Sequence, residues 1–177
     1  MLQRTKAEQV VPVYEDFVSH YSTPRDVSFE NPAEIQRLLE PLGLKRRAKR
    51  IIALAKELAS RGNDVPKVFE KLTELPGVGH YAACAYLSFH LETRTSIVDA
   101  NAVRLWARVL GLKIEKEMRR NKEFLFLIDK MTPSEEYKTF NYAVLDYTRN
   151  VCKQKPLCEI CIIGAFCTYY QKNNTSA

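Results

Sequence analysis

The sequence lacks the features of a secreted or membrane protein. In its 177 residues, no run of apolar residues is long enough to span a bilayer. The first residues do not form a signal peptide, because the charged side chains Arg4, Lys6 and Glu8 interrupt them at once. We therefore expect a cytoplasmic protein with no membrane partner.

The sequence also has only three histidines and no strand-rich region, internal repeat or low-complexity segment. Apolar residues instead recur at helical spacing along nearly the whole chain. Asn31-Pro32 and Thr132-Pro133-Ser134-Glu135 have the form of helix starts, each with an acid at the capping-box position. These patterns predict an all-α fold with helices over residues 10–21, 32–40, 45–60, 66–73, 80–91, 100–110 and 116–130 and from 135 toward 150, and with a frayed tail from residue 172.

Four of the five cysteines lie close together near the C-terminus, with the spacing C-x5-C-x2-C-x5-C. Such a density indicates a metal cluster, a zinc site or a disulfide knot. The intervals fit neither a zinc ribbon with two C-x2-C pairs nor a finger with histidine ligands. Four thiolates in one compact loop favour an iron–sulfur cluster of the 4Fe-4S type, ahead of zinc and disulfides. The expected ligands are Cys152, Cys158, Cys161 and Cys167.

Basic residues outnumber acidic ones, and the formal net charge is +6. A positive chain favours an anionic partner without proving one. Part of this charge is concentrated in the segment 45–50, in Lys45, Arg46, Arg47, Lys49 and Arg50. This basic cluster is either a solvated helix face or a contact surface for nucleic acid.

A second feature points to the same class of partner. Two predicted helices are joined by Leu75-Pro76-Gly77-Val78-Gly79, a candidate helix-hairpin-helix at about residues 73–91. Gly77 and Gly79 can adopt positive φ, which lets backbone N–H groups point outward beside the next helix N-terminus. Such a turn suits a DNA phosphate, and we expect contacts from Gly77, Val78, Gly79 and His80. A plain interhelical turn is the alternative.

Three motifs in this order resemble those of a known family. The string 75–79, then Ile97-Val98-Asp99-Ala100-Asn101, then the four-cysteine loop are similar to the helix-hairpin-helix DNA glycosylases. The chain most resembles their iron–sulfur branch, which holds endonuclease III, adenine DNA glycosylase and the thymine/uracil mismatch glycosylases. The resemblance covers essentially the whole chain. It implies a base-excision-repair enzyme that acts as a monomer on double-stranded DNA in the nucleoid.

The resemblance also implies the organisation of the chain. We expect a six-helix barrel lobe over residues 1–93 and a cluster lobe over 94–177, with the cluster loop at 152–167. A mismatched or damaged nucleotide would be flipped into a pocket, because its glycosidic bond cannot be reached inside the stack. By position, Leu44 would be a wedge that fills the hole, and Gln3 and Arg4 would contact the orphaned base. Leu44 could instead be a capping contact of the basic helix.

The sequence departs from the family pattern in two places. The family usually has a further segment before the string that begins at Met1, so this is either a short form or part of a longer protein. The first cysteine interval is also one residue shorter than usual, which a loop absorbs easily.

Two residues decide the expected chemistry. Asp99 matches the family's catalytic aspartate, whose charge stabilises the oxocarbenium-like state that forms as the glycosidic bond breaks. It is also a favoured N-cap residue for the helix that follows, and both roles can hold. Tyr81 stands where endonuclease III-like enzymes have a lysine. A phenol cannot form a Schiff base, so we expect a monofunctional glycosylase without efficient lyase activity, with water as the nucleophile.

The leading hypothesis is therefore excision of thymine or uracil mispaired with guanine, as tyrosine at position 81 resembles the mismatch branch. The alternatives are excision of adenine from A·G or A·8-oxoguanine pairs or of oxidised pyrimidines, a non-catalytic DNA-binding protein with a metal cluster, and a zinc-bound regulatory module.

Overall fold

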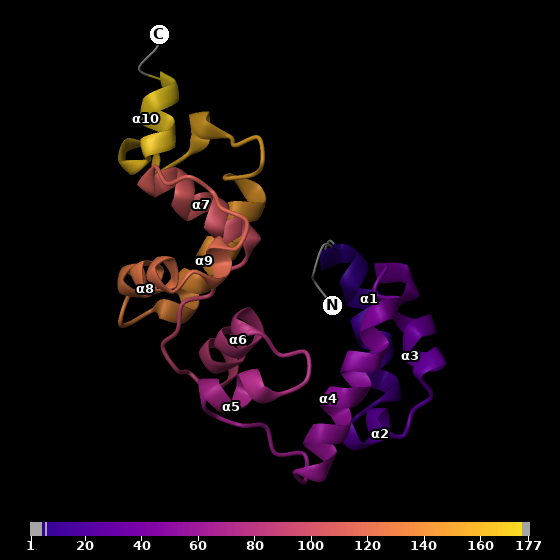
Figure 1. Cartoon of the computed structure of the whole chain (residues 1–177). Coiled ribbons are helices and arrows are strands. Elements are labelled where there is room, and N and C mark those ends of the chain that lie inside the picture. The colour runs from indigo at the N-terminus through magenta and orange to yellow at the C-terminus, as the bar shows by residue number, and fades with distance from the viewer. Residues whose placement is uncertain (1–4, 6, 175–177) are drawn as a thin grey trace. The chain divides into compact units, whose positions relative to one another are not determined.

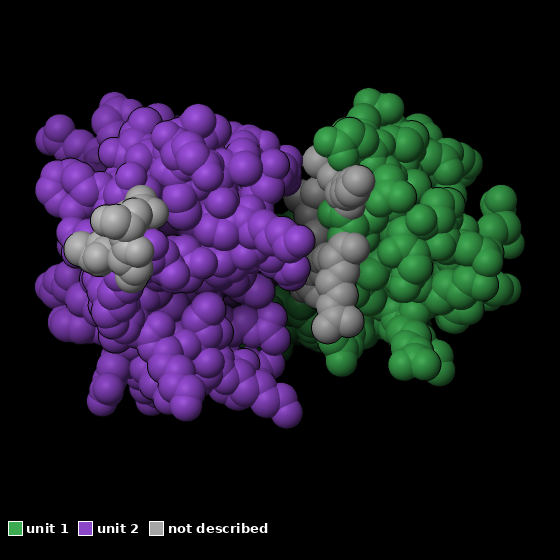
Figure 2. Space-filling view, turned by 90° about the horizontal axis from the view of Figure 1, so that it is seen from above, with its two compact units in different colours: residues 1–79 green, residues 80–177 purple. Residues whose placement is uncertain are grey.

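The structure, a computed structural model, describes residue 5 and residues 7–174. Within these residues the chain is helical and contains no strand, which confirms the predicted all-α class (Figure 1). It divides into two compact units, residues 1–79 and residues 80–177 (Figure 2). None of the described helices is long and apolar enough to cross a membrane.

Unit 1 is built around the helix α4. Its described elements are α1 Ala7–His20, α2 Pro24–Ser28, α3 Pro32–Leu39, the 3-10 turns η1 Glu40–Leu42 and η2 Lys45–Arg47, α4 Ala48–Ser60 and α5 Phe69–Glu74. Helices α2 and α3 pack against α4. Their shared core contains Val27, Ile35, Leu39, Ala48, Ile52 and Ala55, all under a tenth exposed.

Caps explain why two of these helices begin where they do. Asn31 caps α3 by accepting from Ala33 N at 2.9 Å, with Pro32 at the first helical position, as predicted. Glu34, expected to complete a capping box, instead pairs with Arg37. The sequence analysis missed α2, where Thr23 and Asp26 form a capping box.

Unit 2 contains the remaining elements. They are α6 His80–His90, α7 Ala100–Leu110, η3 Met118–Arg120, α8 Lys122–Met131, α9 Tyr137–Asn150, η4 Cys158–Ile160, η5 Gly164–Phe166 and α10 Thr168–Asn174. Helix α7 is the largest single contributor to the core, which also takes in Phe124, Ile128 and Val144. Gly111 ends α7 in the left-handed conformation, with φ of 68°, as its predicted C-terminal position requires.

Several predicted boundaries were wrong. The helix expected from Lys45 starts with the separate turn η2, and the one expected over 116–130 is broken at Asn121, which caps α8. The tail is helical to Asn174. Thr132 does not open α9: it is buried at the C-terminal end of α8, where its hydroxyl donates to Ile128 O at 3.0 Å. A hydroxyl that can reach a carbonyl of the preceding turn donates to it and does not cap a new helix.

Two polar side chains fix the segment that leads into α7. The buried Asn141 accepts from Ile97 N at 3.2 Å and donates to Ser88 Oγ and to Thr95 O. Arg94 forms an ion pair with Asp129 and also donates to backbone carbonyls after α8. The irregular stretch before Asp99 is therefore held by long-range hydrogen bonds, which a local sequence pattern does not reveal.

These contacts also explain at which residue the chain divides into the two units. Asn141 ties α6 to α9, so α6 belongs to unit 2, and the division falls after residue 79. The lobe boundary expected between residues 93 and 94 stays a prediction.

Candidate active site

Asp99 is the N-cap of α7. Its Oδ1 accepts from Asn101 N at 2.9 Å and from Ala102 N at 2.7 Å, and its Oδ2 accepts from Asn101 Nδ2 at 3.1 Å. The carboxylate is half-buried and its direction is fixed by these three bonds. A carboxylate has acceptor capacity for about four hydrogen bonds. Oδ2, with one partner in the described chain, can therefore accept a further proton donor such as water.

Tyr81 lies in the first turn of α6 and shares the electrostatic surroundings of Asp99. Its side chain is partly covered, and it is 39% exposed. Burial raises the pKa of the Tyr81 phenol above its usual value, and the negative charge of Asp99 adds to the rise, while the positive charge of Arg149 opposes it. The phenol is consequently neutral at physiological pH, and it can act as a hydrogen-bond donor next to the carboxylate.

A relay of hydrogen bonds connects Asp99 to the cysteine-rich loop. Asn101, which donates to Asp99, accepts from Arg104 Nη1 at 2.8 Å. Arg104 also donates to Thr148 O at 3.1 Å and to Cys152 O at 2.9 Å. The sequence analysis assigned no role to Asn101 or Arg104. The sequence feature that could have identified them is their i, i+3 spacing, which places both on one helix face directly after Asp99.

The hairpin turn belongs to unit 1. Gly77 has φ of 80°, as expected, and Val78 N donates to Leu75 O at 3.1 Å. A side chain at Gly77 would have room, since the Cβ of Arg50 lies 3.5 Å from the position of an added Cβ, so the positive φ is what favours glycine there. Gly79 does not have positive φ, so that expectation was wrong. It has open space around it, and the left-handed residue of the turn is Gly77 alone.

The basic cluster lies around the start of α4. Lys45, Arg46, Lys49 and Arg50 are exposed, and Arg47 is half-buried. Lys45 forms an ion pair with Glu40, with Nζ 2.6 Å from Oε1. A hollow lined by Arg47, Arg50, Leu44 and Gly77, among others, joins the basic cluster to the hairpin turn.

Four further residues were predicted to contact DNA: Gln3, Arg4, Leu44 and His80. Leu44 packs at the edge of the unit 1 core, and its carbonyl accepts from Arg47 N at 2.8 Å. This fits the alternative of a capping contact, and the wedge role stays a prediction. Gln3 and Arg4 lie outside the described residues. His80 begins α6, with Nδ1 3.6 Å from Cys84 Sγ.

The four clustered cysteines line one pocket in unit 2, and none is in a disulfide. The rest of the lining is largely apolar and includes Leu105, Val109 and Ile163. Two side chains donate to sulfur: Arg108 Nη1 lies 3.4 Å from Cys152 Sγ, and the Tyr147 hydroxyl lies 3.0 Å from Cys161 Sγ. In the part of the chain that the structure describes, no three histidine, cysteine or acidic side chains converge as ligands of one metal ion.

Cys84, the remaining cysteine, is separate from this pocket. It is buried in α6, and burial raises the pKa of its thiol to about 12. It is therefore a small core residue.

The part of the chain that carries the hairpin turn and Asp99 matches a known family model. Residues 1–129 match the model of the HhH-GPD superfamily of base excision DNA repair proteins. The chain belongs to this superfamily. The match includes both the hairpin turn and Asp99, and it confirms the family predicted from the motifs.

Individual HhH-GPD proteins resemble the chain along nearly all of its length. It is 36% identical to a thymine-DNA glycosylase of Aeropyrum pernix, over 98% of this chain and 80% of that protein. It is 34% identical to a thymine/uracil-DNA glycosylase of Pyrobaculum aerophilum, over 97% and 78%. Adenine DNA glycosylases match with identities of 27–32%.

A solved HhH-GPD structure shows the same fold. The structure of a thermostable thymine-DNA glycosylase superposes with a TM-score of 0.89 and 29% identity, over 97% of this chain and 80% of that one. The helical arrangement predicted from the sequence is thus that of a glycosylase.

Proposed function

We propose that this protein is a monofunctional DNA glycosylase that hydrolyses the N-glycosidic bond of thymine or uracil mispaired with guanine. The observation that carries the proposal is the pairing of Asp99 with Tyr81. The family model supplies the glycosylase class, and residue 81 decides between hydrolysis and lyase chemistry. The relatives with the higher identities above are named for thymine or uracil, which favours these bases over adenine.

Asp99 supplies the negative charge that the reaction needs. As the C1′–N bond breaks, its electron pair leaves with the base and positive charge grows on the sugar. A fixed carboxylate stabilises that charge, and Oδ2 has capacity to accept a proton from the attacking water. The oxygen of this water then forms the new bond to C1′, the departing base anion takes up a proton from solvent, and the products are a free base and an abasic sugar.

Tyr81 excludes the alternative nucleophile. A lysine at this position would attack C1′ through its amine and lead to strand cleavage. The phenol of Tyr81 is held neutral by burial and by Asp99, so it is a weak nucleophile. It is suited to pack on the flipped nucleotide or to donate a hydrogen bond beside it.

The four-cysteine pocket fits a 4Fe-4S cluster. In such a cube each iron takes one thiolate, so the four sulfurs surround the cluster and do not converge on one point. Cys152, Cys158, Cys161 and Cys167 line one largely apolar pocket, and Arg108 and Tyr147 donate to two of the sulfurs, which suits such a cluster. When bound, the cluster would cross-link the loop and hold it on α7.

Double-stranded DNA is the proposed partner, bound by a monomer. The backbone at Gly77, Val78 and Gly79, with His80 after it, would contact a phosphate, and the basic cluster would contact others. Such contacts position the duplex and read no sequence. Selection would then come from the low cost of flipping a mispaired base.

The experiment is base release from a panel of duplexes. The panel contains T·G, U·G, A·8-oxoguanine and thymine glycol, and free bases are quantified by mass spectrometry. We expect thymine and uracil, and little adenine. Release of adenine alone would identify an adenine glycosylase. Tight binding of every duplex without release of any base would indicate a non-catalytic DNA-binding protein.

A further inference from the structure

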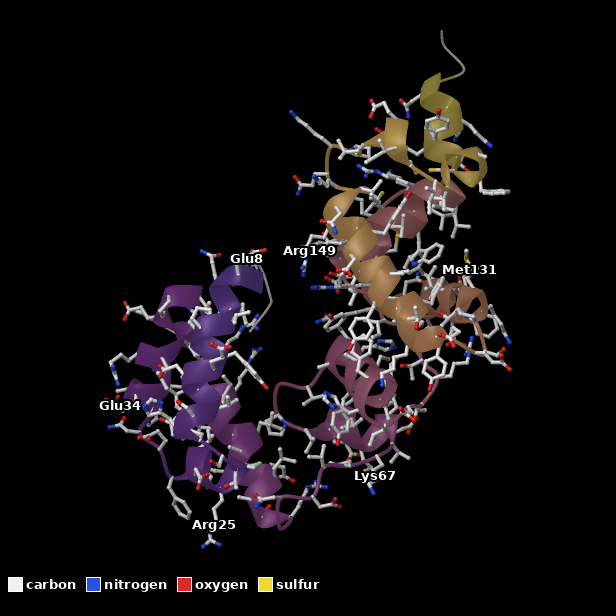
Figure 3. All side chains as sticks on the ribbon, turned by 180° about the vertical axis from the view of Figure 1, so that it is seen from behind. Glu8, Arg25, Glu34, Lys67, Met131 and Arg149 are labelled. Carbon is white, nitrogen blue, oxygen red and sulfur yellow. The ribbon has the colours of Figure 1, made fainter. Side chains whose placement is uncertain are left out.

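Arg149 is a charged residue close enough to Tyr81 to lower the pKa of its phenol, and no part of the mechanism uses it. It lies in the last turn of α9 and is exposed at the surface of unit 2 (Figure 3). Its guanidinium makes no hydrogen bond or ion pair with any residue that the structure describes. It is therefore available to a ligand.

The position of Arg149 is fixed by the hydrogen bonds that also hold Asp99. Helices α7 and α9 pack against each other. Arg104 of α7 donates to Thr148 O, directly before Arg149, and to Asn101, which donates to Asp99. The end of α9 is thus tied to the start of α7. The opposing effects of Asp99 and Arg149 on the pKa of Tyr81 also show that these three groups share one neighbourhood.

A flipped nucleotide creates a need for positive charge at this place. Its sugar must approach the Asp99 carboxylate, and it brings its two flanking phosphates along. Like charges so close repel one another in a site of reduced dielectric constant. Arg104 and Arg108 cannot compensate, because their guanidinium groups already donate to backbone carbonyls of the cysteine-rich loop.

We propose that Arg149 binds a phosphodiester next to the flipped nucleotide and so holds its sugar against Asp99. Arginine suits this task, because its planar fork matches two phosphate oxygens at once. The role rests on the proposed function and adds a substrate-binding residue to it. It also makes the glycosylase site a combination of three elements: α6 with Tyr81, the start of α7 with Asp99, and the end of α9 with Arg149.

The test pairs a change in the protein with a change in the DNA. The probe is a duplex with a tetrahydrofuran abasic analogue opposite guanine, in which each flanking phosphate is replaced in turn by an uncharged methylphosphonate. Binding is measured for the wild type, Arg149→Ala, Arg149→Lys and the control Arg119→Ala, an exposed arginine of η3. Thermal unfolding checks that each variant is folded.

We expect Arg149→Ala to weaken binding of the all-phosphate duplex about tenfold, as for a lost hydrogen bond to a charged group. Methylphosphonate at one flanking position should weaken the wild type by a similar factor and leave Arg149→Ala unchanged. Arg149→Lys should recover part of the loss, and Arg119→Ala should match the wild type. Additive effects of the mutation and the methylphosphonate at both positions would overturn the inference.

The outcome is separable from that of the proposed function. If base release from T·G occurs but the two changes are additive, only the phosphate contact is wrong. If no duplex in the panel loses a base but the two changes are coupled, the phosphate contact stands and the glycosylase proposal fails.

Discussion

At the scale of single residues, one carboxylate has both a structural and a chemical task. Asp99 caps α7 through Oδ1, and its negative charge raises the pKa of Tyr81. The first task needs only an oxygen acceptor, whereas the second needs a negative charge. Substitutions that keep the acceptor and remove the charge therefore separate the two.

We predict that Asp99→Asn keeps the fold and loses the reaction. Asparagine retains an oxygen that can accept from Asn101 N and Ala102 N, so the melting temperature should stay close to that of the wild type. Loss of the charge should lower the rate of thymine release by ~10² to 10³. Single-turnover assays with excess enzyme measure this rate. Asp99→Ala is the matched control, since it should also destabilise the protein by about 1 kcal/mol through the lost cap. An unimpaired rate in Asp99→Asn would remove the carboxylate from the mechanism.

A second residue-scale prediction concerns Tyr81. Its pKa is raised above the usual value near 10, so the phenol carries no charge between pH 6 and 9. Because a phenol cannot form a Schiff base in either protonation state, borohydride should trap no covalent adduct between the wild type and T·G DNA. Tyr81→Phe should change the rate by the same factor at each pH in this range. A trapped adduct would show that some amine of the protein attacks C1′.

At the scale of elements, Arg104 joins α7 to the end of α9 and to the cysteine-rich loop. It donates to Asn101, to Thr148 O and to Cys152 O. Because Cys152 is a proposed cluster ligand, the hydrogen bonds of the Arg104 side chain link the start of α7 to the cluster loop.

We predict that Arg104→Gln destabilises this coupling. It should lower the free energy of unfolding by about 1–3 kcal/mol, as buried hydrogen bonds to a charged group are lost. It should also speed the loss of iron on incubation with a chelator, starting from the roughly four irons per chain that the proposed cluster would supply. Urea unfolding and iron assays measure the two effects. Arg120→Gln, a variant of an exposed arginine paired with Glu117, is the control. Equal stability and equal iron retention in the two variants would contradict the coupling.

The sequence predicted the elements that rest on local patterns. The apolar helix that follows Asp99 and ends at Gly111 was predicted correctly, because a capping residue stands at each of its ends. The buried Asn141 and the Arg94 ion pair were not predictable, because their partners lie far along the chain. The prediction for Thr132 failed for a related reason. A threonine before a proline resembles an N-cap, but burial in the folded protein directs its hydroxyl to a carbonyl of the preceding helix.

At the scale of the whole molecule, the net charge of +6 is not spread evenly. Five basic residues lie within the segment 45–50, close to the hairpin turn of the same unit. The family motifs predict that this part of unit 1 contacts phosphate, and that contact stays a prediction. Which of the basic side chains take part depends on the relative position of long, exposed groups, and sequence spacing does not determine it.

We predict that DNA binding weakens steeply with salt and that the basic cluster contributes to this. Each neutralised phosphate adds about 0.9 to the slope of log affinity against log salt concentration. Replacing Arg46, Arg47 and Lys49 by alanine should therefore flatten the slope measured by fluorescence anisotropy. Arg37→Ala, which removes a cation already paired with Glu34, should leave the slope unchanged. A triple variant with the slope of the wild type would assign the basic cluster to a solvated face.

The central claim is that this HhH-GPD protein releases a mispaired pyrimidine by hydrolysis. The most direct measurement uses a T·G duplex labelled on the thymine strand, incubated with excess enzyme and analysed with and without alkali. The account predicts free thymine and a labelled strand that stays intact until alkali breaks it at the abasic site. A strand already broken without alkali, or no thymine released from a duplex that the protein binds, would contradict it.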